Sequence, residues 1–120
     1  MLRNLLLTDV EALCQINEQA LGYSFSTEKT AQQLAKLTKD AHHFFIGFED
    51  SVTQQLLGYV HAEIYQSLYS DPGFNILALA VLPYQQGKGI GKTLLQGLEV
   101  EANQRGYAFI RLNSADYRTE

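Results

Sequence analysis

Three glycines separated by single residues form the part of the sequence best suited to bind a ligand. Gly87, Gly89 and Gly91 lie within 79–93, Leu-Ala-Val-Leu-Pro-Tyr-Gln-Gln-Gly-Lys-Gly-Ile-Gly-Lys-Thr, after an apolar run and before a helical pattern. Glycine allows unusual main-chain angles and a close approach to a ligand. The first N–H groups of a helix have no intrahelical acceptor, and the helix dipole favours negative charge there. This order of elements predicts an anion site, most often for a phosphate.

A nucleotide-binding P-loop is one alternative, because Gly91-Lys92-Thr93 matches the end of that motif. A P-loop places four residues between its first glycine and this triplet. Here only three residues separate Gly87 from Gly91. The one apolar run that follows ends in Asn113, not in an aspartate that could help to hold magnesium. A P-loop protein is therefore the weaker interpretation.

The stretch from Gln86 to Gly91 fits the pattern Q/R-x-x-G-x-G/A and so resembles the GNAT family of N-acetyltransferases. The preceding Leu-Ala-Val-Leu-Pro is similar to the strand end that carries this pattern in the family. The resemblance implies that the turn binds the pyrophosphate of acetyl-CoA and that the fourth strand holds its pantetheine arm. The implied cofactor-binding residues are Leu79, Ala80, Val81, Gln86, Gly87, Lys88, Gly89, Ile90, Gly91, Lys92 and Asn113. The alternative interpretation of Lys88 is a solvated charge at a helix start.

What the resemblance implies chemically is direct attack by an amine, from a small molecule or a protein, within a ternary complex. A main-chain N–H near Leu79 would polarise the thioester carbonyl. An alkyl amine has a pKa near 10.4, so a base or a water chain must first remove a proton. Many relatives carry a glutamate early in the fourth strand, where this chain has Asn75 and apolar residues. Glu63 on the neighbouring strand is the candidate base, and a solvent-facing glutamate is the alternative.

Periodicity predicts the elements that position these residues. Side chains at 74–82 are apolar on both faces, which predicts a central strand covered by helices on both sides. Gly97 in the following helix predicts close contact with the sheet. The expected elements are a strand over 2–7, a helix from a capping box at Thr8 and Glu11 to Gly22, a helix over 27–38, strands over 43–48, 56–65 and 74–82, a helix from 90 to Gly106, and a strand over 107–112.

This β-α-α-β-β-β-α-β order also resembles the GNAT family. The resemblance implies an α/β (α+β) fold in a single domain over 1–120. Its sheet would be mixed and mostly antiparallel, splayed between the fourth and fifth strands, with helices on both faces: the acyl-CoA N-acyltransferase fold. Relatives continue with a further helix, whose tyrosine protonates the thiolate, and with further strands, whereas this sequence ends at Glu120. We therefore expect an exposed fifth-strand edge that pairs with a second copy in a homodimer.

Several aromatic and imidazole side chains are candidates for the acceptor pocket. Tyr23 and Phe25 lie in the loop between the first two helices, where Phe25 is interpreted as a plug between helices and Tyr23 as a possible pocket wall. His61 and Tyr65 share the polar face of the third strand with Glu63. The adjacent histidines at 42 and 43 have no metal-ligand spacing and are interpreted as structural.

The composition of the chain limits which other classes of function it can have. With 46% hydrophobic residues, 18% charged residues and a net charge of −4, the sequence is globular and has no basic excess for nucleic acid. The only cysteine, Cys14, lies in a helical apolar pattern and is interpreted as a core residue. With no signal peptide pattern or membrane-spanning run, a cytoplasmic protein is expected. We also expect that the protein needs no metal. A non-catalytic acyl-CoA-binding domain of the same fold is the alternative function.

Overall fold

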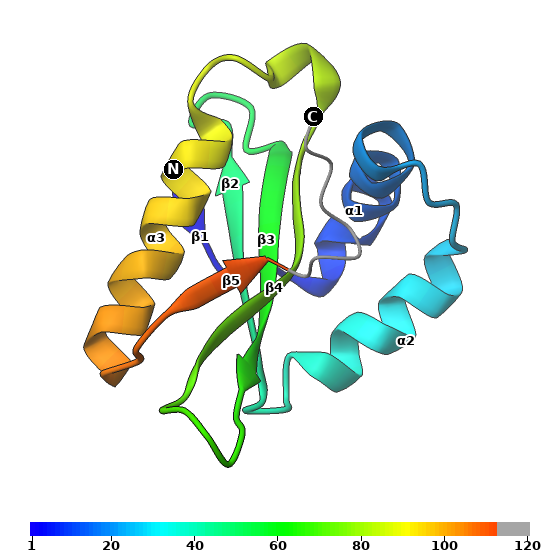
Figure 1. Ribbon diagram of the computed structural model, residues 1–120. Coiled ribbons are helices and arrows are strands. Elements are labelled where there is room, and N and C mark those ends of the chain that lie inside the picture. Colours follow the sequence, from blue (N-terminus) through cyan, green and yellow to red (C-terminus); the bar gives the residue numbers. More distant parts are fainter. Residues whose placement is uncertain (113–120) are drawn as a thin grey trace.

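The computed structural model describes residues 1–112, which form a central sheet with helices packed on both of its faces (Figure 1). The order of strands and helices confirms the predicted β-α-α-β-β-β-α-β. The elements are β1 (Leu2–Arg3), α1 (Val10–Ile16), α2 (Thr27–Leu37), β2 (His43–Glu49), β3 (Leu56–Tyr65), β4 (Gly73–Val81), α3 (Ile90–Arg105) and β5 (Ile110–Leu112). A π-helical turn, Asn17–Leu21, continues α1, and 3₁₀ turns span Leu7–Asp9 and Pro83–Gln85.

The sheet is mixed, with five strands in the order β1-β2-β3-β4-β5. The first three pairings are antiparallel and β4 pairs with β5 in parallel, as the fold assignment predicts. The register between β3 and β4 shifts after His61, which faces Ala78, to Ala62, which faces Ile76. Leu77 is therefore the extra residue of a bulge in β4, and a bulge locally bends and twists its strand.

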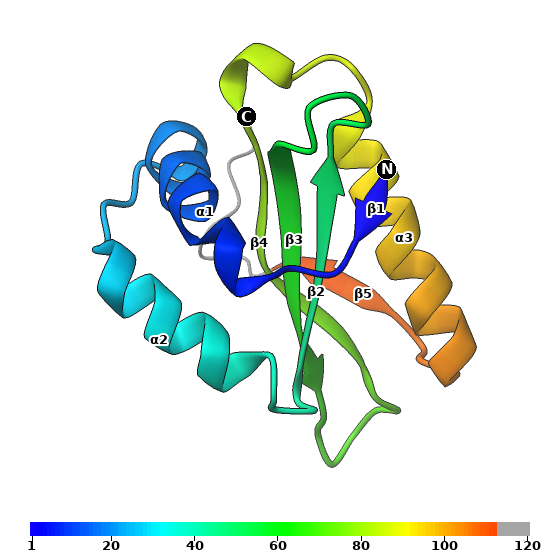
Figure 2. The same cartoon turned by 180° about the vertical axis from the view of Figure 1, so that it is seen from behind.

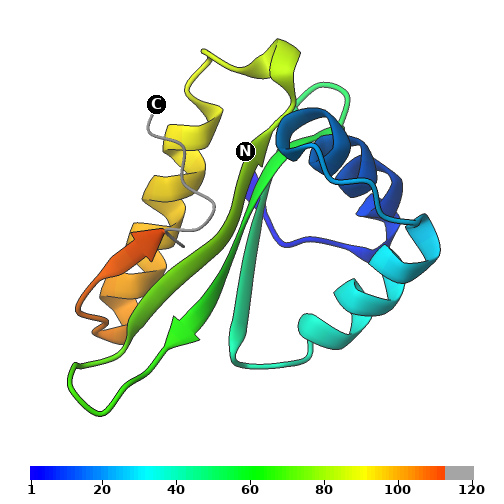
Figure 3. The same ribbon diagram turned by 45° about the vertical axis from the view of Figure 1, so that its right-hand side comes forward.

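The two helical layers are clearest in Figure 3, where α3 lies on one side of the sheet and α1 with α2 on the other. The stripe predicted for α3 is confirmed, because Ile90, Leu94, Leu98 and Ala102 are all buried. Gly97 permits close packing: a Cβ placed there would lie 2.7 Å from Leu2 Cδ1 and 3.2 Å from Ile46 Cδ1. This layer holds the N-terminus of α3, and with it the glycine turn, against the end of β4.

The N-terminal segment differs from the prediction. The strand ends at Arg3, after which the chain crosses the sheet to reach α1 (Figure 2). The predicted capping box of Thr8 and Glu11 is wrong, because the Asp9 carboxylate instead accepts the N–H of Leu6 at 2.7 Å. Arg3 donates to both Asp9 and Glu49, so a tertiary ion-pair network replaces the local cap.

The other helix ends follow local rules. Ser26 caps α2 by accepting the N–H of Lys29 at 3.0 Å. The predicted stops at Gly22 and Gly106 are confirmed, since both glycines adopt left-handed conformations, with φ of 77° and 72°.

The last strand begins at Ile110, later than predicted, because the main chain before it turns: Tyr107 N–H donates to the Ala102 carbonyl. None of the helices in residues 1–112 has the length and hydropathy to span a membrane.

Candidate active site

The glycine turn connects the end of β4 to α3 and holds the main chain in an unusual conformation. Gly87 and Gly89 have φ of 85° and 82°, values that L side chains rarely adopt. A Cβ built on either glycine meets no atom within 4 Å, so both face open space. The Gln86 side chain fixes the start of the turn by donating from Nε2 to the Val81 carbonyl at 3.2 Å. The turn is thus shaped by main-chain conformation and open toward a ligand.

Several main-chain N–H groups lie close together at this turn. The N–H of Thr93 is the first in α3 to find an acceptor, the carbonyl of Gly89 at 3.0 Å. Among the described residues, the N–H groups of 87–92 have no such acceptor. A cavity of about 350 Å³ lies in front of them. Its lining consists of Leu79, Val81, Gln85, Gln86, Gly87, Gly89, Ile90, Gly91 and Lys92.

One side of β4 beside this cavity has no partner strand among residues 1–112. The ladder between β4 and β5 ends at the pair Ile76–Leu112, whereas β4 continues to Val81. Within residues 1–112, the stretch 78–81 pairs only with β3, and Leu77 is the unpaired residue of the bulge. As far as the described residues show, this side of β4 can therefore hydrogen-bond an extended ligand that follows the strand.

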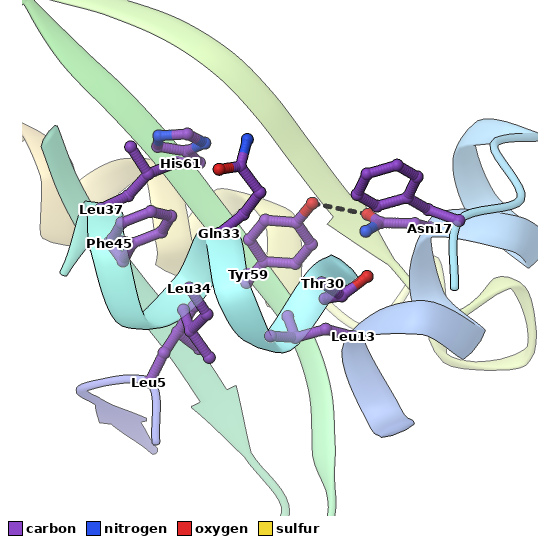
Figure 4. Close-up of a pocket in the computed structure, with 11 residues that line it drawn as sticks. Leu5, Leu13, Asn17, Thr30, Gln33, Leu34, Leu37, Phe45, Tyr59 and His61 are labelled. Carbon is purple, nitrogen blue, oxygen red and sulfur yellow. Dashed lines mark hydrogen bonds between the residues drawn. The ribbon is translucent and has the colours of Figure 1, made fainter. Parts of the chain in front are cut away.

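A second cavity, of about 160 Å³, lies between the sheet and the helices α1 and α2 (Figure 4). Its apolar lining consists of Leu5, Leu13, Phe25, Leu34, Leu37 and Phe45. Its polar lining consists of Asn17, Thr30, Gln33, Tyr59 and His61. Leu5, Leu13, Leu34 and Tyr59 are buried, whereas Phe25 and Gln33 are exposed, so the cavity has a buried floor and an accessible rim.

Two hydrogen-bonded pairs satisfy polar atoms of this second cavity. The Tyr59 hydroxyl donates to Asn17 Oδ1, and burial raises the pKa of Tyr59 to about 12 although this bond lowers it. His61 Nε2 lies 3.0 Å from His43 Nδ1, and its ring stacks on Phe45 with centroids 4.1 Å apart. Burial, assisted by His43, lowers the pKa of His61 to about 4, so the ring is neutral at pH 7.

Glu63 lies two residues beyond His61 on the same face of β3. Its Oε2 accepts from Asn75 Nδ2 at 3.0 Å, and its Oε1 lies 3.5 Å from His42 Nε2. Asn75 is buried, and its Oδ1 has no hydrogen-bond partner among the described residues. Residues 1–112 contain no group of three or more His, Cys, Asp or Glu side chains placed to share a metal ion.

The sequence matches the Acetyltransferase (GNAT) family over residues 10–119. The chain belongs to the GNAT acetyltransferase family. Solved structures agree: a GNAT acetyltransferase from Staphylococcus aureus superposes with a TM-score of 0.82 at 21% identity, covering 100% of this chain and 92% of that one. No curated protein sequence is a significant match.

Two further GNAT-fold structures carry specific names. An aminoglycoside 6'-N-acetyltransferase from Acinetobacter haemolyticus has a TM-score of 0.79 at 15% identity, covering 96% of this chain and 79% of that one. A glucosamine-6-phosphate N-acetyltransferase from Arabidopsis thaliana has a TM-score of 0.77 at 16% identity, covering 94% and 80% respectively. At these identities the similarity to solved structures supports the fold alone. Membership of the GNAT family supports acyl transfer as the reaction.

Most residues that the GNAT resemblance assigns to the cofactor lie together in the structure. Eight of them line the first cavity: Leu79, Val81, Gln86, Gly87, Gly89, Ile90, Gly91 and Lys92. Ala80 lies in β4 between two of these residues but is buried, and Lys88 is exposed in the turn. Asn113 lies outside the described residues. Their contact with a cofactor stays a prediction.

The residues predicted to contact the acceptor do not all come together. His61 lines the second cavity, whereas Tyr23 is exposed and outside its lining. Tyr65 lies at the far end of β3, where its hydroxyl is 3.1 Å from that of Tyr69. Phe25, interpreted from sequence as a plug, lines the cavity and is 52% exposed.

Asn17 and Tyr59 were not among the residues predicted for the site. A signal for Asn17 was present, because this polar residue occupies a position on the apolar stripe of the first helix. Alternation along the third strand places Tyr59 on the same face as His61 and Glu63, but it gives Tyr59 no role.

Proposed function

We propose that the protein is an N-acetyltransferase that transfers the acetyl group of acetyl-CoA to a small-molecule amine. The observation that carries this proposal is the turn before α3, where Gly87 and Gly89 expose a run of main-chain N–H groups to an open cavity. Such donors at a helix N-terminus suit a diphosphate. The Lys92 side chain, which also lines the cavity, adds positive charge.

The side of β4 that has no partner strand among residues 1–112 supports binding of the pantetheine arm. Alternate main-chain groups of 77–81 point away from β3, so they are available to an extended chain that runs beside the strand. The arm would place the thioester near Leu79, where a main-chain N–H polarises its carbonyl. Acetyl-CoA supplies the activated acetyl group: the amine nitrogen forms the new C–N bond, the C–S bond breaks and the thiolate leaves.

The amine proton must pass through water to reach Glu63. Glu63 pairs with Asn75, four residues before Leu79 on β4. At about 3.3 Å per residue, this separation is about 13 Å along the strand, beyond the reach of a glutamate side chain. The Asn75 amide holds one carboxylate oxygen of Glu63 in place. We therefore assign Glu63 as the terminal proton acceptor of a water chain.

Small-molecule amines are the proposed acceptors because the similar structures include acetyltransferases named for an aminoglycoside and for glucosamine-6-phosphate. The alternative of a non-catalytic acyl-CoA-binding domain has a specific observation in its favour. The family position for a glutamate on β4 holds Asn75, an amide that cannot accept a proton as a base. Turnover with an amine decides between the two.

The first experiment measures binding and turnover separately. Calorimetry with acetyl-CoA should show saturable binding, whereas ATP with magnesium should show none. Thiol release from acetyl-CoA in the presence of an amine panel should then detect catalysis. Binding without thiol release for any amine would favour the non-catalytic alternative, and absence of acetyl-CoA binding would refute both.

The second experiment tests Glu63. Glu63→Gln keeps an oxygen that can accept from Asn75, so the fold should be preserved, but it removes the base. We expect kcat to fall about 100-fold at pH 7 and to recover as rising pH deprotonates the free amine. Glu99→Gln, at an exposed position of α3, is the matched control and should leave kcat unchanged. A Glu63→Gln enzyme with the wild-type pH profile would remove Glu63 from the mechanism.

A further inference from the structure

We propose that the acceptor amine carries an uncharged apolar group about the size of a phenyl ring, and that this group binds in the second cavity, between the sheet and α1 with α2. This inference rests on the proposed acetyltransferase function and specifies the acceptor of that reaction. It follows from the size, the lining and the position of the cavity.

The volume of the cavity suits a single ring. It is about 160 Å³. An apolar protein cavity of about 150 Å³ is large enough to bind benzene. A larger polycyclic or sugar-based group would not be enclosed, whereas a methyl or ethyl group would leave most of the volume unfilled.

The lining of the cavity suits an uncharged group. No Asp, Glu, Lys or Arg side chain is among the residues that line it. The Tyr59 hydroxyl and Asn17 Oδ1 already bind one another, and His61 Nε2 is paired with His43 (Figure 4 shows the first of these bonds). A charged group buried there would lose its hydration without an ionic partner.

The cavity also lies beside the proposed donor site. Tyr59 of its floor is the cross-strand partner of Ala80, in the stretch of β4 that we assign to the pantetheine arm. Adjacent strands are about 4.8 Å apart. A ring above β3 is therefore roughly one to two strand spacings, about 5–10 Å, from the free side of β4. A short alkyl linker between ring and amine spans this separation.

The rim of the cavity offers a matched pair of variants. Gln33 and Gln32 are neighbouring exposed glutamines of α2, but only Gln33 lines the cavity. In Gln33→Trp a large side chain would obstruct the entrance. In Gln32→Trp the same side chain would project elsewhere, so it controls for any effect of a surface tryptophan on folding or on the donor site.

Activity is tested by thiol release with 2-phenylethylamine, 4-phenylbutylamine, spermidine and glucosamine 6-phosphate. We expect at least one phenylalkylamine to have a kcat/KM at least tenfold above those of spermidine and glucosamine 6-phosphate. Gln33→Trp should lower kcat/KM for that phenylalkylamine at least tenfold, and Gln32→Trp should leave it within twofold. Equal or better use of spermidine or glucosamine 6-phosphate would overturn the inference and leave the acetyltransferase function intact.

Binding is tested independently of turnover with 2-phenylethanol, which has the ring but no amine. Calorimetry should show that it binds the wild type and Gln32→Trp, and that Gln33→Trp weakens its affinity at least tenfold. No binding to the wild type, or equal affinity for both variants, would contradict the assignment of the cavity whatever the activity. Binding of 2-phenylethanol without thiol release from any amine would instead uphold the ligand class and overturn the acetyltransferase.

Discussion

Replacing Gly89 with alanine separates ligand binding at the glycine turn from the stability of the fold. Gly89 has φ of 82° and a Cβ there would meet no protein atom within 4 Å. The cost to the folded protein is therefore conformational, about 1–2 kcal/mol for an L-residue in the left-handed region. For a domain of this size we expect the melting temperature to fall by about 3–8 °C. The added methyl projects into the space proposed for the diphosphate, so acetyl-CoA affinity should fall at least tenfold.

Gly106→Ala is the matched control for this strain. Gly106 has φ of 72°, also has no atom within 4 Å of a built Cβ, and ends the same helix. At 1.5 Å per residue, the 16 residues of α3 place it about 24 Å from Gly89. Chemical denaturation should give similar losses of stability for both variants, and calorimetry should show weakened acetyl-CoA binding only for Gly89→Ala. Wild-type affinity in Gly89→Ala, or an equal loss in Gly106→Ala, would refute the placement of the diphosphate.

Three other predictions follow from the geometry. The pKa of His61 is about 4 in the folded protein against 6.5 for the unfolded chain, so the unfolded state binds more protons between these values. The free energy of unfolding should therefore fall by about 2.5 kcal/mol from pH 7.5 to 4.5. Urea titrations should show this loss for the wild type and not for His61→Gln. Parallel pH profiles of stability for the two proteins would contradict the prediction. Tyr59→Phe removes a partner from Asn17 and should cost about 1–2 kcal/mol of unfolding free energy, with unchanged stability as the contrary result. Within residues 1–112 the outer edge of β5 has no partner strand, and from this edge we predict a homodimer; sedimentation would exclude it by finding monomers at high concentration.

The sequence was informative wherever a local rule determines structure. Gly22 and Gly106 end helices because glycine tolerates a left-handed residue, and both stops were predicted. The bounds of β3 were also predicted, because a turn-rich segment precedes an alternating apolar pattern. The capping box at Thr8 was wrong because Arg3 draws Asp9 into an ion-pair network with Glu49, which is far away in the sequence, and no local pattern reports such a network.

The second cavity could not be predicted for a related reason. Its lining comes from α1 and the π-helical turn that continues it, from α2, β2 and β3, and from the segments before α1 and before α2, so it depends on how these elements pack. Alternation along β3 placed His61 on the correct face but also suggested Tyr65, which lies beyond the cavity. Besides His61, Asn17, a polar residue on an apolar stripe, indicated from the sequence that this part of the core is polar.

The two cavities differ in what forms them, and this difference explains how far each can vary. The turn before α3 offers main-chain N–H groups, so its chemistry requires glycine at two positive-φ positions and little else from the side chains. The fold itself tolerates wide divergence in sequence, as the TM-score of 0.82 at 21% identity illustrates. The second cavity is formed by side chains, so a substitution at Gln33 or Phe25 changes its volume or charge while the turn is untouched. Acceptor preference should therefore be adjustable from the rim of the second cavity without loss of acetyl-CoA binding.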